Sequence, residues 1–344
     1  MQVRLFQENR SDAEAWDAYV AKSETATCDH LWGWSRILSK VFGFRPYYLA
    51  AVQDESVVGI LPLFRIPQGL GRYALSSIPF GNYGGACADT ADIARALLDE
   101  AKSMMREKGC GYLELRHRVP LADATLHQKD LHHRFFFPIT ADPDAMFKAI
   151  GTKSRNNIRM ALKQGLKVVE STDVHPLYLI HTQNFHRLGT PCFPKQYFEA
   201  IMTEFSGRTL LHYAQHENQM VAFSLLLSFK QSLVCQFSGS LEAFFKYKPN
   251  NMLFWHEVEK GYALGMKELD YCRSRVDSGS ATFKRRLGFS EEPLGYQYYL
   301  NGHKQALPSR HPSNKKYQLA IKLWQRLPVA WANAAGPKLV RYFA

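Results

Sequence analysis

Four cations lie close together in the segment 152–164, which the sequence predicts to be a helix that ends at Gly165. They are Lys153, Arg155, Arg159 and Lys163. Arg155, Arg159 and Lys163 are four residues apart and would therefore share one helical face. Converging cations of this kind suit a phosphate or pyrophosphate group. A solvated charged face is the other interpretation, and both stay open, although residues 145–169 contain no Asp or Glu.

A second polar cluster flanks the loop after a short predicted strand, Glu268–Tyr271. Its members are Arg273, Ser274, Lys284 and Arg285. Polar residues at strand ends in an open α/β sheet commonly face the ligand. Arg273 would orient a carboxylate or phosphate, and Lys284 would bind phosphate or stabilise a developing oxyanion. Asp270 is either a general base or a structural partner of Arg273, and both interpretations stay open.

Two short loops complete the set of candidate residues. The first carries Lys246, Lys248, Asn250 and Asn251 before a predicted helix at Met252–Leu264. An N-cap role would explain the two asparagines but would leave the two lysines unexplained. The second loop, PFGNYGG at Pro79–Gly85, carries Asn82 and Tyr83. Its glycines allow a substrate to approach the backbone closely, but they also simply make turns.

The same order of elements occurs twice along the chain. Each half is predicted to contain two helices, three strands, a loop, a further helix and a final strand. The strands of the first half are expected at Pro46–Val52, Val57–Phe64, Tyr73–Ile78 and Tyr112–Leu115. Those of the second half are expected at Leu210–Gln215, Met220–Phe229, Ser232–Ser238 and Glu268–Tyr271. A duplicated α/β unit also accounts for 344 residues, which exceed the size of most single cores.

The sequence resembles a known family over nearly its whole length. A three-stranded antiparallel meander followed by a helix and a strand resembles the GNAT acyltransferase fold. FGFRPYYLAAV, SIPFGNYGGACAD, GTKSRNNIRMALKQGLKV, KPNNMLFWHEVEKGYALGMKELDYCRS and SGSATFKRRLGF are similar in content and order to the FemAB transferases. The nearest resemblance is to the FemAB-related proteins of exosortase (PEP-CTERM) and exopolysaccharide systems. The tail of this chain, LWQRLPVAWANAAGPKLVRYFA, also resembles that subgroup.

The resemblance implies an α/β (α+β) fold of two tandem GNAT-like units, with mixed, largely antiparallel sheets flanked by helices. The expected ranges are 1–140 for the first unit, 141–306 for the second and 307–344 for a basic tail. It also implies a transferase that moves an aminoacyl or acyl group from an ester or thioester donor to an amine or hydroxyl of an envelope or exopolysaccharide precursor. A neutral nucleophile attacks the carbonyl directly, and no GxSxG signature of a covalent nucleophile occurs.

The resemblance assigns roles to most of the candidate residues. Arg273-Ser274 and Phe283-Lys284 match the subgroup's motifs, and Asn82 and Tyr83 would contact the acceptor. Lys246 and Lys248 stand where a GNAT unit meets the donor's phosphate. The donor is aminoacyl-tRNA or acyl-CoA, with no tightly bound cofactor. The R-x-x-G-x-G/A signature of coenzyme A binders is missing from the loop that carries Lys246 and Lys248, which disfavours acetyl-CoA.

The net charge of +12 is concentrated in two segments. Residues 145–169 carry six cations and residues 301–344 carry eight, without an acid in either, so the rest of the chain is nearly neutral. Phosphate-bearing lipid-linked precursors, tRNA and an anionic membrane at a helix over Lys315–Arg326 are the expected partners. One side of the tail helix is expected to carry Tyr317, Leu319, Ala320, Leu323, Trp324 and Leu327. Packing of this helix on the body of the protein would explain the pattern equally well.

The alternative functions are a nucleic-acid-binding protein and a scaffold of the polysaccharide machinery. Neither basic segment shows a recognisable module that reads nucleic acid. The start of the chain does not resemble a secretory signal, so a cytoplasmic protein, peripheral at the inner membrane, is expected. Its six scattered cysteines are expected to be reduced and buried. No metal site is expected, because the histidines and cysteines lack ligand spacing.

Overall fold

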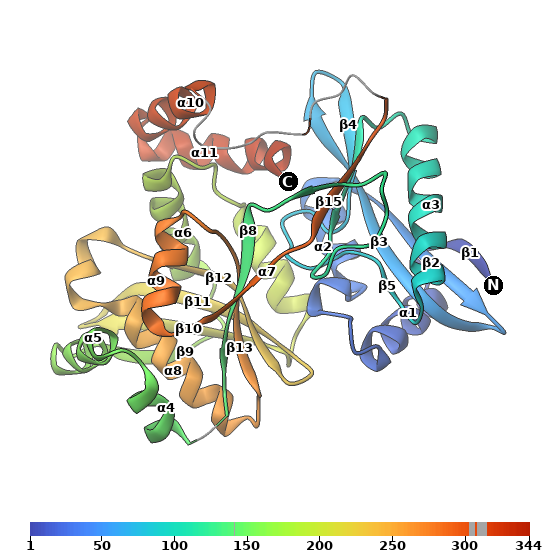
Figure 1. The fold of residues 1–344 in the computed structure, drawn as a ribbon. Coiled ribbons are helices and arrows are strands. Elements are labelled where there is room, and N and C mark those ends of the chain that lie inside the picture. Colours follow the sequence, from blue (N-terminus) through green and yellow to red (C-terminus); the bar gives the residue numbers. More distant parts are fainter. Residues whose placement is uncertain (141, 303–306, 308–314) are drawn as a thin grey trace. The chain divides into compact units, whose positions relative to one another are not determined.

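The computed structural model describes residues 1–140, 142–302, 307 and 315–344. The chain forms two compact units. Unit 1 comprises residues 1–131, 293–309 and 341–344, and unit 2 comprises residues 132–292 and 310–340. Each unit has its own sheet and its own helices (Figure 1). All six cysteines are free and buried, as expected.

Unit 1 has a mixed sheet between two layers of helices. Its strand order is β1-β2-β3-β4-β6-β15-β7, and β5 also pairs with β3. The strands are β1 (Gln2–Phe6), β2 (Arg45–Gln53), β3 (Ser56–Gly69), β4 (Arg72–Ser76), β5 (Cys87–Ala88), β6 (Tyr112–Arg116), β7 (His127–Lys129) and β15 (Tyr296–Leu300). One face packs on α3 (Ala91–Glu107). The other face, through Tyr48, packs on Trp16 of α1 (Arg10–Lys22) and on Trp32, which precedes α2 (Gly33–Phe42).

Unit 2 repeats this arrangement with the strand order β14-β8-β13-β12-β11-β10-β9. The strands are β8 (His132–Pro138), β9 (Lys167–Glu170), β10 (Thr209–His216), β11 (Gln219–Phe229), β12 (Ser232–Ser240), β13 (Glu268–Arg275) and β14 (Ser290–Pro293). The helices are α4 (Pro143–Ala149), α5 (Thr152–Lys163), α6 (His175–Leu188), α7 (Lys195–Glu204), α8 (Pro249–Ala263) and α9 (Gly279–Leu287). Helix α8 contacts β10, β11, β12 and β13, while α6 contacts β11 and β12.

The two units share the predicted core, which confirms the predicted fold class. In unit 1, β2, β3 and β4 form an antiparallel meander, and after α3 the strand β6 returns parallel to β4. In unit 2, β10, β11 and β12 form the meander, and after α8 the strand β13 returns parallel to β12. Both sheets are therefore mixed but largely antiparallel.

The units are not contiguous in sequence, which differs from the predicted ranges 1–140 and 141–306. Strand β15, near the end of the second predicted range, pairs with β6 of unit 1. Strand β8, near the end of the first predicted range, pairs with β13 of unit 2. Both strands lie inside their sheets, β15 between β6 and β7 and β8 between β14 and β13.

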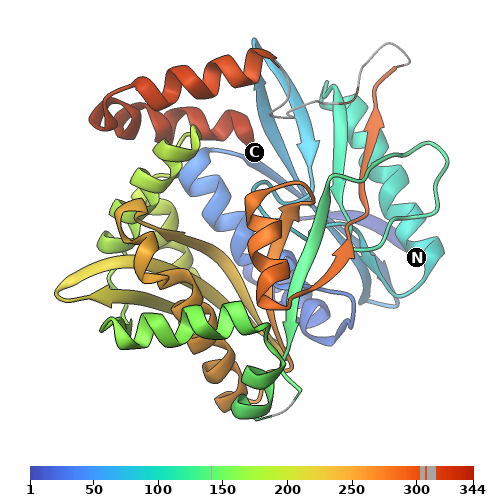
Figure 2. The same cartoon turned by 60° about the vertical axis from the view of Figure 1, so that its left-hand side comes forward.

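Two helices, α10 (Lys315–Arg326) and α11 (Val329–Leu339), follow near the C-terminus. Figures 1 and 2 show them as a hairpin in red. Residues 308–314 and the side chains of Lys315, Lys316 and Tyr317, all in the predicted basic tail, lie outside the described residues. Within the part of the chain that the structure describes, no helix has the length and hydropathy to cross a membrane.

Candidate functional site

Unit 2 contains a hollow of about 300 Å³ where the N-termini of α5 and α8 meet α9. We call it the α5–α8–α9 hollow. It is lined by Gly151, Thr152, Lys153, Ser154, Asn157, Asn251, Phe283, Arg286 and Leu287. Three segments that the sequence singled out therefore contribute to one site: the basic helix, the loop before α8 and the segment around Lys284.

The start of α5 presents backbone donors and a cation at this hollow. Ser154 Oγ donates to the carbonyl oxygen of Arg286 at 2.6 Å, which fixes the helix start against α9. The amides of Ser154 and Arg155 donate to Gly151 O. Those of Thr152 and Lys153 have no partner among the described residues, as expected for the first turn of a helix without a side-chain cap. Such a terminus favours a bound anion.

The start of α8 contributes a buried amide side chain. Lys248, at φ +60°, is the N-cap, and its carbonyl accepts from the amides of Asn251 and Met252. The predicted N-cap role of the asparagines is therefore wrong. Lys248, in the left-handed conformation, precedes the helix, and Pro249 is its first residue. Asn250 instead donates to Ser240 Oγ at 2.9 Å. Asn251 is only 6% exposed, and its side chain has no hydrogen-bond partner among the residues described.

The electrostatics of the α5–α8–α9 hollow favour a negatively charged ligand. Lys153 and Arg286 supply positive charge, and none of the described lining residues is acidic. Asn157 lies one turn after Lys153, so the two share a helical face. Phe283 and Leu287 add an apolar wall. This combination can hold a phosphate while an adjoining apolar or planar group packs on the phenyl ring.

The other cations of α5 turn away from this hollow. The Arg155 guanidinium donates to the carbonyl oxygen of Lys148 on α4 and, at 3.2 Å, to Thr152 Oγ1. Arg159 stacks on Phe147, with 5.3 Å from its guanidinium carbon to the ring centroid. Lys163 belongs to this face by its helical spacing and is exposed. Of the predicted cluster, only Lys153 therefore reaches the hollow.

Lys246 and Lys248 also have local roles. Lys246 is exposed, and its ammonium nitrogen lies 4.9 Å from the ring centroid of Tyr247. Lys248 is the N-cap residue described above. Neither lines the α5–α8–α9 hollow.

Lys284 is buried and holds an irregular strand end. The ladder between β13 and β8 shifts between Asp270 and Arg273, and Cys272 has φ +56°. The Lys284 ammonium donates to Tyr271 O at 2.5 Å, to Ser274 Oγ at 2.9 Å and, at 3.5 Å, to Cys272 O. Burial lowers its pKa below the ordinary value of 10.5. The structure thus brings Lys284 and Ser274 together, as predicted, in a strained turn.

Asp270 faces inward, but it is engaged by the protein. Its carboxylate accepts from Arg134 Nε at 2.7 Å and from the Cys272 amide at 2.6 Å. Arg134, on β8, is 2% exposed and also contacts Glu268 at 2.5 Å and Glu292 at 3.3 Å. Of the two open interpretations, this geometry favours a structural role, with Arg134 as a partner that sequence reasoning missed.

Arg273 and Arg285 flank the same strand end. Arg273 is half-buried and stands opposite Arg134 in the β-ladder. Arg285 is exposed and forms an ion pair with Glu291, with 2.7 Å from Nε to Oε2. Arg285 therefore stabilises the turn between α9 and β14.

Sequence reasoning also missed Glu257, a fully buried acid on α8. Ser224 and Tyr271 both donate to its carboxylate, Tyr271 at 2.5 Å. Burial raises the pKa of Glu257 to about 7. Since the Tyr271 carbonyl accepts from Lys284, Glu257 and Lys284 stabilise the same strand from two sides. Its position on α8 facing the sheet was the only available sequence signal.

The raised pKa of Glu257 predicts a pH-dependent stability. Glu257→Gln should be more stable than the wild type above pH 7, by about 2–3 kcal/mol, and equal to it near pH 4.5. The reason is that the unfolded carboxylate ionises above its ordinary pKa of 4.5, whereas the buried one keeps its proton up to about pH 7. The wild type therefore loses stability between these two pH values, while glutamine stays neutral. Urea unfolding of both proteins across this range measures the difference. Glu199→Gln on α7, an exposed acid, is the matched control and should show no such trend.

Asn82 and Tyr83 are buried in unit 1, at 8% and 3% exposure. Their backbone amides donate to Asp29 Oδ2 at 2.6 and 2.7 Å. Their carbonyl oxygens accept from Tyr296 and Thr27. The glycine turn is thereby fixed to its own unit, and a Cβ at Gly85 would lie 2.1 Å from the His117 ring. Their predicted contact with the acceptor stays a prediction.

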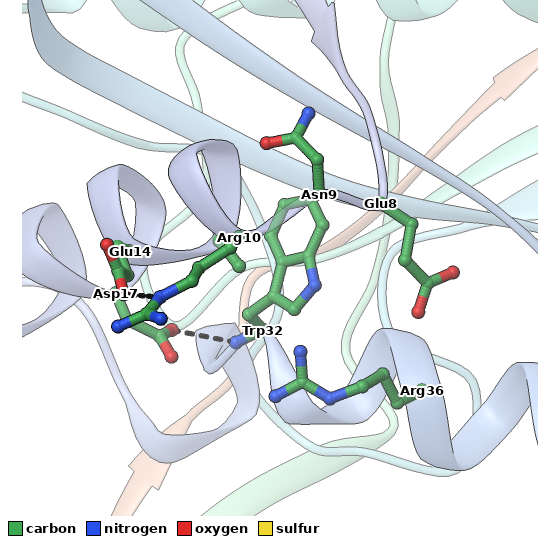
Figure 3. A pocket seen from close by; sticks show the side chains of 8 residues that line it. Glu8, Asn9, Arg10, Glu14, Asp17, Trp32 and Arg36 are labelled. Atoms are coloured by element: carbon green, nitrogen blue, oxygen red, sulfur yellow. Dashed lines mark hydrogen bonds and ion pairs between the residues drawn. The ribbon is translucent and has the colours of Figure 1, made fainter.

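Unit 1 has a hollow of its own, of about 580 Å³ (Figure 3). It is lined by Glu8, Asn9, Arg10, Ala13, Glu14, Asp17, Trp32 and Arg36. Arg10 pairs with Glu14 at 2.7 Å, and the Trp32 amide donates to Asp17 at 2.8 Å. Three carboxylates stand beside two guanidinium groups, so this hollow lacks the positive charge of the one in unit 2.

The comparisons with known proteins agree with this architecture. Residues 152–285, which contain α5, α8, β13 and most of α9, match the model of an acetyltransferase (GNAT) domain. The solved structure of FemX is similar over 95% of this chain and 100% of its own, with a TM-score of 0.68 and 15% identity. The chain has a FemX-like tandem GNAT fold. No curated protein matches the sequence.

Two further structures share this fold at low identity. L-PGS from Bacillus licheniformis has a TM-score of 0.56 and 11% identity, covering 91% of this chain and 97% of its own. A tandem GNAT protein from the clavulanic acid biosynthesis pathway has a TM-score of 0.56 and 12% identity, covering 88% and 99%. At these identities the likeness concerns the fold, and the chemistry has to be argued from the site.

Proposed function

We propose that this protein is a transferase that moves an acyl or aminoacyl group from an activated donor to an amine or hydroxyl acceptor. The observation that carries the proposal is the α5–α8–α9 hollow. It combines two helix N-termini, Lys153 and Arg286 with the nine-tenths buried, unpartnered Asn251 side chain. In a GNAT-like unit, this is where the phosphate of an acyl donor would be held.

The donor is an aminoacyl-tRNA or an acyl-CoA. Both carry phosphate and a planar base, which suits the cationic lining and the Phe283 wall of the hollow. The names of structures with this fold include both kinds of group: one is a domain of a putative lysylphosphatidylglycerol synthetase from Agrobacterium fabrum, and the clavulanic acid protein is named with reference to AcCoA. The loop before α8 lacks the coenzyme A signature, which favours the tRNA ester.

The reaction needs no covalent enzyme intermediate. The acceptor's nitrogen or oxygen lone pair forms the new bond to the donor carbonyl carbon, and the ester or thioester bond breaks. The nucleophile loses its proton, and the departing hydroxyl or thiol takes one up. Lys284 is one turn from the hollow-lining Leu287 and would stabilise the developing oxyanion by exchanging its longest contact, 3.5 Å to Cys272 O, for the substrate.

The acceptor is a phosphate-bearing envelope or exopolysaccharide precursor, soluble or lipid-linked. This part of the proposal, like the association with exosortase (PEP-CTERM) systems and action in the cytoplasm at the inner membrane, depends on the sequence resemblance. Asn82 and Tyr83 of unit 1 remain the proposed contacts to it. Arg273 would orient a carboxylate or phosphate of a substrate near β13.

Incubation of the purified protein with labelled acyl-CoA or labelled aminoacyl-tRNA and an envelope extract tests the proposal. Movement of one label into the extract supports transfer and identifies the donor. Transfer from neither donor would contradict the proposal and would favour a scaffold.

Lys153→Glu should weaken binding of the donor about 10- to 100-fold, because an anion would then meet a carboxylate at the α5 terminus. Titration of the protein with non-hydrolysable aminoacyl-tRNA or with CoA measures this change. Lys163→Glu is the matched variant, since it makes the same charge change on the same helix but on the other face. Equal losses in both variants would support the predicted cation stripe and contradict the hollow.

A further inference from the structure

The α10–α11 hairpin packs on α6. Ile321 lies against Gly189 at the end of α6, and Gly336 lies against Cys192. Gln325 Nε2 donates to Arg187 O at 2.7 Å, and the His186 ring pairs with Leu327 O at 2.9 Å. Trp324, predicted on the leucine side, is half-buried with its indole nitrogen shielded, and it belongs to the docked side with Ile321.

The opposite face of this hairpin is apolar and open. Leu319 and Leu323 of α10 and Leu327, directly after the helix, are four residues apart, so they form one stripe. They are 59%, 55% and 38% exposed. Directly after them, Val329 and Trp331 of α11 are 42% and 71% exposed. We call these five residues the leucine face; they are large side chains that the fold leaves in water.

The leucine face is bordered by positive charge. Lys322 follows Leu319 by three residues, and Arg326 follows Leu323 by three, so both cations lie along one edge of the stripe. Both are exposed. Lys338 on α11 is also exposed. The sequence has no acid between residues 301 and 344. Docking on α6 and an open leucine stripe are therefore both present, on different sides of one helix.

We propose that the leucine face is a docking surface for an anionic lipid bilayer. A helix that lies in a membrane interface has leucine and tryptophan on one side and lysine or arginine along the border, which is the pattern of α10–α11. A second copy of this chain would bring like charges together across a two-fold interface, which disfavours self-association. The proposal does not depend on the transfer chemistry, so the two can fail separately.

Trp331 provides a direct probe of this contact. Four of the other five tryptophans are at most 7% exposed, and Trp324 is half-buried, so a solvent-dependent emission change would come mainly from Trp331. Vesicles of phosphatidylcholine with added phosphatidylglycerol should shift the emission to the blue, and brominated lipid should quench it. Trp331→Phe should remove most of both signals. Vesicles of phosphatidylcholine alone should give a much smaller shift.

Co-flotation with the same vesicles separates the apolar and the ionic contributions. Leu323→Glu should lower the bound fraction about tenfold, and Lys322→Glu with Arg326→Glu should lower it similarly at low salt. The matched controls are Leu70→Glu, a 94% exposed leucine of unit 1, and Lys22→Glu on α1, both of which should bind as the wild type does. Raising the salt concentration should weaken the wild type but should change the double variant little.

Four outcomes would overturn the proposal. The first is equal flotation with and without phosphatidylglycerol. The second is wild-type binding by Leu323→Glu. The third is dimerisation of the free protein in sedimentation that Leu323→Glu abolishes, because the leucine face would then be a contact between copies. Capture of an acidic protein without any lipid binding would likewise contradict a bilayer as the occupant.

Discussion

Replacement of Lys284 by methionine should lower the rate of transfer about 100- to 1000-fold, the range seen when one oxyanion donor is removed. Lys284 is 5% exposed, and burial lowers its pKa below 10.5. Its positive charge in a low-dielectric site would act strongly on an oxyanion. The loss should appear in kcat and much less in KM. The alkaline fall of the wild-type rate should lie below pH 10.5 and should disappear in Lys284→Met.

The same ammonium also holds the end of β13, so a structural effect has to be separated from a catalytic one. Loss of its bonds to Tyr271 O and Ser274 Oγ should cost about 1–3 kcal/mol of stability. Thermal unfolding measures that cost independently of the rate. Lys267→Met, an exposed lysine just before β13, is the matched control for both measurements. A variant that loses stability but transfers at the wild-type rate would make Lys284 purely structural.

The elements that could be predicted from the sequence are those with local signals. Apolar spacing and turn residues predict the meanders, and the ends of α5, β11 and β12 differ from prediction by at most two residues. Each of these elements is specified by contacts with its neighbours in sequence. The repeated order of elements then predicts two similar units, and the parallel return strands β6 and β13 confirm it.

The features that escaped prediction depend on residues that are distant in sequence. Arg134 is 136 positions from Asp270, and the sequence offered Arg273 as a closer partner. Glu257 meets Ser224, 33 positions away. Helical spacing also grouped Arg155, Arg159 and Lys163, but it could not show that α4 lies against that face. Local patterns determine which residues share a face, while tertiary packing determines what that face meets.

Arg134→Met should destabilise unit 2 by about 3–5 kcal/mol, the usual cost of removing one member of a buried ion pair. Asp270 is 3% exposed, and it would lose the charged donor Arg134 Nε, which lies 2.7 Å from its carboxylate. Glu268 and Glu292 are partly exposed and can regain water. Urea unfolding at neutral pH measures the loss.

Asp270→Asn on the Arg134→Met background decides what Asp270 does. If the carboxylate serves mainly to pair with Arg134, the second change should recover much of the lost stability, because the buried group that lost Arg134 is then neutral. Asp270→Asn alone should then keep most of the transfer rate, since Arg134 retains Glu268 and Glu292. A folded Asp270→Asn protein whose rate falls by a factor of about 1000 would instead make Asp270 the general base. The Arg134 contact would then orient that base and would not merely neutralise it.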